Sequence, residues 1–136
     1  MRRPFFTVSL ALAWVVSACN WGTRPRDFPP ANRPEGARVA VRVKGETADR
    51  IGELYAVDAS GLLVRTTALT RIPWSRLAAM DVLHLGRAYD VAFDEPVNPE
   101  RRDRLATVSR FPQGLDGPLL AKVLMLLSQR EVEIVP

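Results

Sequence analysis

Apolar and polar residues alternate between residues 37 and 86, and this pattern predicts a run of short strands. Val39, Val41 and Val43 recur at every second position, which is the period of a half-buried strand. By the same criterion we expect further strands over residues 50–57, 62–67, 69–72 and 79–85. Five short strands at this spacing are typical of a small barrel or sandwich.

The breaks between these strands carry turn signals. Asp58-Ala59-Ser60-Gly61 predicts a tight hairpin in which Gly61 takes a positive φ angle. Gly52, inside the second strand, suggests a bulge or a sharp bend. Pro73-Trp74-Ser75-Arg76 predicts a single helical turn, and we expect Trp74 to fill the core.

Residues 87–136 have a different pattern and predict two helices followed by a short strand at 131–135. Asn98-Pro99 is a good helix start, with Leu105 and Val108 as a thin apolar stripe. Asp116-Gly117-Pro118 opens a second helix with a wide leucine-rich face. We expect this face to close the open end of the barrel. The alternative is a surface for a lipid or a partner helix, formed by Leu119, Leu120, Val123, Leu124 and Leu127.

The first 18 residues have the layout of a cleavable export signal. Two arginines precede an apolar run of 12 residues, Phe5 to Val16, and small residues follow. A transmembrane helix needs about 20 apolar residues, so the run is too short to span a bilayer. Residues 20–36 contain four prolines and no apolar period, which predicts a semi-extended tether.

Val16-Ser17-Ala18-Cys19 resembles the lipobox of bacterial lipoproteins. The resemblance implies cleavage before Cys19, diacylglyceryl transfer to its thiol, and stable anchoring in a membrane by two or three acyl chains. Asn20 resembles the outer-membrane class, so we expect a lipid-anchored protein that faces the periplasm. Arg2-Arg3 also resembles a twin-arginine signal, which leaves the export route open.

The segment from Gly52 to Leu77 resembles small Sm-like and SH3-like barrels. Those folds have a long bent second strand, a tight turn, and one helical turn between the fourth and fifth strands. The resemblance implies a mainly β fold with α: a five-stranded barrel over residues 37–86, with the helical segment 87–136 packed on it. It implies no activity.

Charge and composition narrow the chemistry. The formal charge of +4 includes Arg2 and Arg3; without them 17 basic residues face 15 acidic ones, too even a balance for nucleic-acid binding. A single cysteine at position 19 excludes disulfides and thiolate metal clusters in the exported domain. Cofactors are not expected, since neither of the phosphate-binding motifs G-x-G-x-x-G and G-x-x-x-x-G-K-[ST] occurs in the sequence.

Three sets of residues have both a functional and a structural interpretation. His84 is the one histidine, and no nucleophile motif surrounds any serine, so we expect a sheet residue. Asp94 and Glu95 could act as paired carboxylates of a small hydrolase, with nearby acids at Asp81, Asp90 and Glu100. An Sm-type RNA surface could be formed by Arg71, Trp74 and Arg76, although export argues against cellular RNA as the partner.

These observations favour a membrane-anchored, non-enzymatic lipoprotein with a binding or envelope-assembly role and an envelope protein as possible partner. A small envelope hydrolase that uses loop carboxylates is the first alternative. A carrier of lipids or small ligands is the second.

Overall fold

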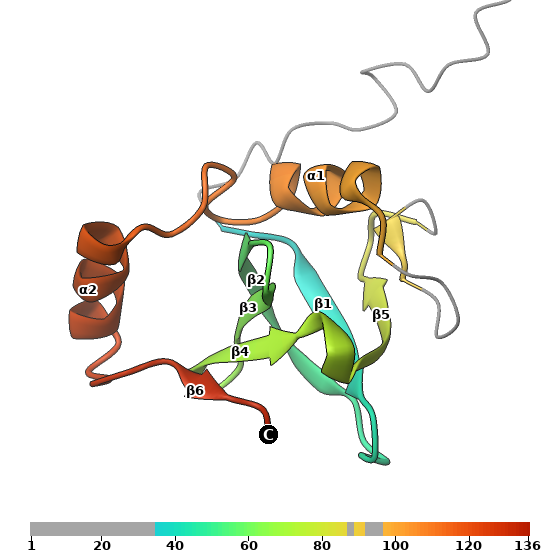
Figure 1. The fold of residues 1–136 in the computed structure, drawn as a ribbon, viewed down its shortest axis with the longest axis horizontal. Coiled ribbons are helices and arrows are strands. Elements are labelled where there is room, and N and C mark those ends of the chain that lie inside the picture. Colours follow the sequence, from blue (N-terminus) through green and yellow to red (C-terminus); the bar gives the residue numbers. More distant parts are fainter. Residues whose placement is uncertain (1–34, 87–88, 92–96) are drawn as a thin grey trace, which may run out of the picture.

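The computed structural model describes residues 35–86, 89–91 and 97–136; the predicted signal, Cys19 and nearly all of the tether lie outside the described residues. The strands are β1 (Arg38–Val43), β2 (Arg50–Val57), β3 (Gly61–Arg65), β4 (Leu69–Pro73), β5 (Leu77–Val82) and β6 (Glu133–Ile134). The helices are the 3-10 turn η2 (Trp74–Arg76), α1 (Pro99–Thr107) and α2 (Gly117–Leu126). Figure 1 shows α1 over one end of the sheet and α2 beside it.

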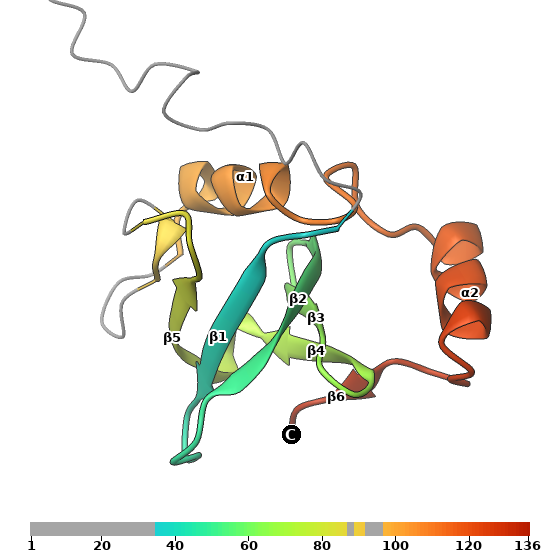
Figure 2. The same ribbon diagram turned by 180° about the vertical axis from the view of Figure 1, so that it is seen from behind.

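The six strands form one open mixed sheet in the order β5-β1-β2-β3-β4-β6. Neighbours are antiparallel except β4 and β6, which run parallel. Figure 2 shows β1 and β2 side by side as an antiparallel hairpin. The chain is therefore mainly β with two helices, as predicted. A five-stranded barrel is not confirmed, because β6 extends the sheet beyond β4.

Both faces of the sheet are covered around β3, where Leu62, Leu63 and Val64 are all buried. Leu62 and Val64 point into a first cluster, which they form with residues of β1, β5 and α1 that include Val41, Met80 and Leu105. Leu63 points into a second cluster, which it forms with Tyr55, Ala56, Leu69 and Val123. A strand buried on both faces carries a continuous apolar run instead of an alternating one. This explains why β3 lacks the alternation that marks β1.

The second strand contains the bulge that the sequence suggested, but at Tyr55 and not at Gly52. The pairing of β2 with β3 shifts between Leu54 and Ala56, so Tyr55 and Ala56 both lie in the second cluster. Gly52 has another role. A Cβ atom at this position would lie 2.4 Å from the Arg65 carbonyl oxygen, so only glycine allows β3 to approach this closely.

Helix α1 covers the end of the first cluster. Asn98 caps it by accepting a hydrogen bond from the Arg101 amide at 2.8 Å, and Pro99 occupies the first turn, as predicted. Its stripe is formed by Leu105, which is fully buried, and by Val108 just after the helix. The helix that closes this core is thus α1, not the leucine-rich α2.

The chain after α1 returns along β2 and meets the first described residues. The amides of Arg110 and Phe111 donate to the carbonyls of Leu54 and Tyr55 at 2.9 and 2.8 Å. One carboxylate oxygen of Glu53 accepts from the Gly36 amide at 2.8 Å and from the Arg110 guanidinium at 2.9 Å. The entry of the chain into the fold is therefore held at the start of the α1–α2 connection.

Three local predictions were wrong. The strand predicted at 79–85 is β5, Leu77–Val82, because the chain turns at His84, whose φ is 70°. Gly61 does not take a positive φ; it is needed because a Cβ there would lie 2.2 Å from the Ile72 carbonyl oxygen. Trp74 does not fill the core but lies half-buried at its edge.

Candidate functional site

Helix α2 carries the residues that the sequence proposed as a partner surface, and both of its ends are well defined. The Asp116 side chain caps the first turn by accepting from the Leu119 amide at 2.8 Å. At the other end, the Ser128 amide donates to Met125 and the Gln129 amide donates to Leu124. These two bonds form a Schellman motif, in which Ser128 takes the left-handed conformation at φ 54°.

One stripe of α2 packs on the outer face of the sheet. Val123 is buried, while Leu120, Leu124 and Leu127 are half-buried in the second cluster. Their partners in this cluster come from the sheet and the flanking loops: Tyr55, Ala56, Leu63, Leu69, Phe111, Leu115 and Val132. The expectation that this helix closes a barrel end is wrong, because it covers a sheet face in a cluster separate from the first. Leu119 is half-buried and lies outside the cluster.

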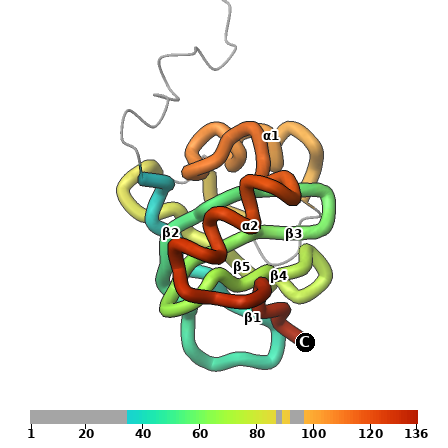
Figure 3. Tube along the Cα trace, turned by 90° about the vertical axis from the view of Figure 1, so that its left-hand side faces the viewer, coloured from blue at the N-terminus to red at the C-terminus, as the bar shows by residue number. Residues whose placement is uncertain are grey.

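The opposite stripe of α2 faces outward. It is formed by residues spaced three and four apart, all exposed: Pro118, Ala121, Lys122, Met125 and Leu126. Met125 is 77% and Leu126 84% exposed, more than Ile134 at 65% and Ile51 at 50%. Figure 3 looks onto α2, with β2, β3 and β4 behind it. We call these five residues the outward stripe.

The outward stripe was missed in the sequence because α2 is apolar on all sides. Lys122 is the one charged residue among the ten of the helix. A helix that is apolar all round is normally covered all round. Here the sheet covers only the leucine side. The lack of a polar face on α2 was therefore the sequence signal for a second contact.

A side-chain clamp fixes the chain after α2. The Gln129 amide group accepts from the Leu69 amide at 2.8 Å and donates to the Leu69 carbonyl at 2.9 Å. Beyond it, β6 pairs with β4, and Val135 returns to the first cluster. The position of α2 is thus fixed from both ends, because Phe111 and Leu115 precede it in the same cluster.

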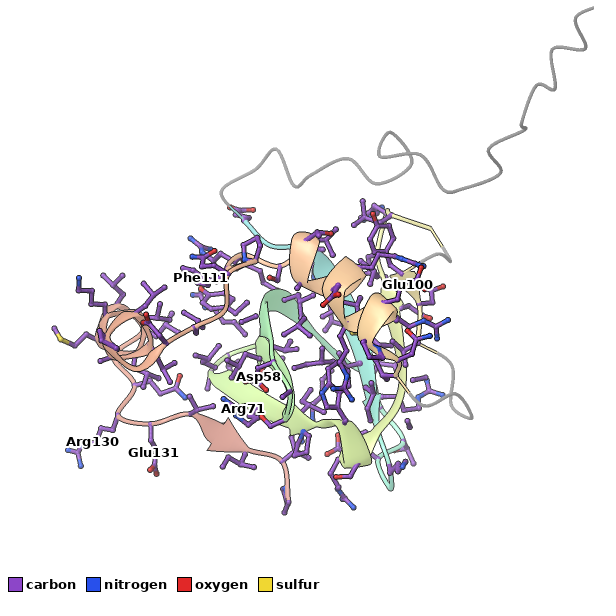
Figure 4. The ribbon with its side chains drawn as sticks, turned by 45° about the horizontal axis from the view of Figure 1, so that its top comes forward. Asp58, Arg71, Glu100, Phe111, Arg130 and Glu131 are labelled. Carbon is purple, nitrogen blue, oxygen red and sulfur yellow. The ribbon has the colours of Figure 1, made fainter. Side chains whose placement is uncertain are left out.

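Two of the three residues proposed as an RNA surface, Arg71 and Trp74, hold the β2–β3 turn. The third, Arg76, donates to the Lys44 carbonyl at 3.4 Å. Arg71 donates to the Asp58 carboxylate at 2.6 Å and to the Ser60 hydroxyl, as Figure 4 illustrates for Asp58 and Arg71. The Trp74 indole donates to the Asp58 carbonyl at 3.0 Å, and one face of its ring lies under Arg102. Arg71 and Trp74 are therefore engaged in internal contacts.

The pKa of Asp58 reflects these contacts. Partial burial alone would raise the pKa of its carboxyl group, but hydrogen bonds from Ser60 and Arg71 outweigh burial and hold the pKa below its usual value. Asp58 also accepts from the Gly61 amide at 3.0 Å. The Asp58 carboxylate therefore holds the β2–β3 turn together by accepting hydrogen bonds from Ser60, Gly61 and Arg71.

The acids proposed for a hydrolase are not brought together in the described chain. Asp94 and Glu95 lie outside the described residues. Asp90 accepts from the Val82 amide at 3.1 Å, and Glu100 pairs with Arg104 on α1 at 3.0 Å. Asp81 is exposed on the outer face of β5. His84 is exposed in the turn after β5, so the expectation that it is a sheet residue is wrong.

A small open pocket lies on the part of the sheet that α2 does not cover. Its volume is about 110 Å³, and its lining comes from β1, β5 and the turn before β2: Ala40, Arg42, Asp49, Ala79, Met80 and Asp81. Arg42 and Asp49 pair across it at 2.7 Å. The pocket has room for a few water molecules, and the charge of Arg42 is already neutralised by Asp49.

No helix in the described part of the chain is long and apolar enough to cross a membrane. Within the same residues, no three metal-ligating side chains of His, Cys, Asp or Glu cluster together. Comparisons with protein families, with curated proteins and with solved structures found no match to this chain.

Proposed function

We propose that this chain is a membrane-anchored lipoprotein with a non-enzymatic binding or assembly role in the cell envelope. The observation that carries the proposal is the sequence of the first 19 residues: an apolar run, two small residues and the single cysteine. Anchoring through two or three acyl chains is stable, so the domain would stay at the bilayer surface. The class of lipobox suggested by Asn20 favours the outer membrane, with the domain in the periplasm.

The geometry of the domain supports a binding role. Its polar clusters are engaged in turns and ion pairs, whereas α2 presents a row of exposed apolar side chains. Exposed apolar patches are typical of contact surfaces. An envelope protein is the partner class that the sequence suggested. Of the five residues first proposed as a partner surface, Leu120, Val123, Leu124 and Leu127 pack in the second cluster, and Leu119 is half-buried outside it.

We also propose that the sheet is a variant of the SH3-like and Sm-like barrels. Three features support this kinship: a long β2 with a bulge at Tyr55, a tight β2–β3 turn, and a 3-10 turn between β4 and β5. The sixth strand, β6, would be an addition to that plan.

The anchor is tested by metabolic labelling with an alkyne fatty acid. The wild-type chain should be labelled and should begin at Cys19 by mass spectrometry, and Cys19→Ala should be unlabelled and unprocessed. Because the chain has one cysteine, labelling has one possible thiol acceptor. A wild-type chain that is unlabelled and retains Met1 to Ala18 would overturn the proposal.

A further inference from the structure

The outward stripe of α2 has no cover within the described residues. Met125 and Leu126 are adjacent, and both are far more exposed than the leucines on the other side of the helix. Lys122 lies one turn before them on the same stripe and is also exposed. The stripe therefore combines two large apolar side chains with one cation.

We propose that the outward stripe is a membrane-contact face that lies in the interface of the bilayer to which Cys19 is anchored. This inference rests on the proposed lipid anchor. Met125 and Leu126 would enter the boundary between headgroups and acyl chains, and the Lys122 ammonium would extend to lipid phosphates. Anionic lipids would strengthen the contact through Lys122.

The tether is long enough to permit this contact. Residues 20–35 form 16 residues of proline-rich chain, which at ~3.1 Å per residue reach about 50 Å. Gly36 and Arg110 share one oxygen of Glu53, so the tether ends beside Arg110. From Arg110 to the start of α2 at Gly117 the chain spans at most about 25 Å, and α2 adds about 15 Å. Every residue of the stripe thus lies within reach of the bilayer.

The size of the stripe favours a bilayer over a second copy of the chain. A helix face about 15 Å long and 10 Å wide presents on the order of 150 Å². A stable protein interface buries about 800 Å² on each partner. A bilayer needs no complementary shape, and the anchor makes the contact intramolecular, so a weak insertion suffices.

The test uses the mature, lipidated chain in vesicles of phosphatidylcholine and phosphatidylglycerol. The Cys19 thiol carries the lipid, so a new cysteine can be labelled selectively with a polarity-sensitive fluorophore. Ala121→Cys places the label on the outward stripe, and Ile51→Cys places it on β2, at a residue that is 50% exposed. Lipids with spin labels on their acyl chains then report contact by quenching.

We expect the label at position 121 to be quenched and blue-shifted, and the label at 51 to be neither. The double change Met125→Asp and Leu126→Asp should reduce quenching at 121 to the level at 51. Equal quenching at both positions would overturn the inference, while flotation with the vesicles would still support the anchor.

Other covers of the stripe give distinct readouts. A blue shift without lipid quenching that grows with protein concentration would indicate a second copy. The same shift without concentration dependence would indicate that residues 20–34 cover the stripe. Either result overturns the membrane contact. A chain that fails to float with vesicles would overturn the anchor, and the inference with it.

Discussion

The side-chain amide of Gln129 pairs with both backbone groups of Leu69, at 2.8 and 2.9 Å, as a neighbouring strand would. Leu69 is fully buried at the start of β4, where an unpaired amide or carbonyl would be costly. The same amide group of Gln129 also donates to the Glu131 carbonyl at 2.6 Å. The Gln129 side chain thus satisfies the edge of β4 at Leu69, and β6 pairs with β4 from Thr70 onward.

Gln129→Ala should lower the free energy of unfolding by about 1–3 kcal/mol, because it leaves both groups of Leu69 without their partner. Thermal or urea unfolding measures the change. Gln113→Ala is the matched control, since Gln113 is exposed, and should stay within about 0.5 kcal/mol of the wild type. A Gln129→Ala variant as stable as this control would show that the clamp contributes little.

The strands and helix starts were predictable because their signals are local. The valines of β1 alternate, and Asn98 and Asp116 precede Pro99 and Gly117-Pro118 as caps. Each signal spans a few residues, and the structure changes the predicted boundaries by only a few positions. The strand predicted at 79–85 extends too far, because β5 ends at Val82 and the chain turns at His84, which is left-handed. Histidine gives no such warning in a sequence.

The arrangement of α2 was not predictable, because it depends on contacts between distant residues. Gln129 and Leu69 are 60 positions apart, and Glu53 and Arg110 are 57 apart. No local period records such pairs. The sequence predicted that the leucine-rich face of α2 packs on the domain, but not that this face meets the sheet in a second cluster and leaves another apolar stripe exposed.

The two stripes of α2 should respond differently to truncation. Leu124 is half-buried in the second cluster, so Leu124→Ala should cost about 1–3 kcal/mol. Leu126→Ala removes a side chain that is 84% exposed and should change stability by less than about 0.5 kcal/mol. Melting curves of both variants test this. Equal losses would mean that the outward stripe is covered in the native protein.

The Asp58 carboxylate should make stability depend on acid. Its folded pKa lies below the unfolded value of about 3.9, so its contribution is present above that value and is lost as pH falls through the folded pKa. Asp58→Asn should therefore be less stable than the wild type at pH 7, with the difference shrinking below about pH 4. Urea unfolding at a series of pH values measures it. A difference that is independent of pH would show that charge is not what holds the turn.

The left-handed residue at the end of α2 offers a stabilising substitution. Ser128 has a φ of 54° and is exposed, so its side chain brings conformational strain to the Schellman motif. Ser128→Gly should relieve that strain and, after the greater freedom of glycine in the unfolded chain is subtracted, raise stability by roughly 0.5–1 kcal/mol. Gly114, at φ 88° with open space around its Cα, is the reverse control, and Gly114→Ser should lower stability by a similar amount. Both changes leave the outward stripe and the second cluster untouched. If Ser128→Gly instead destabilised the protein, the Ser128 side chain would have to stabilise the α2 terminus.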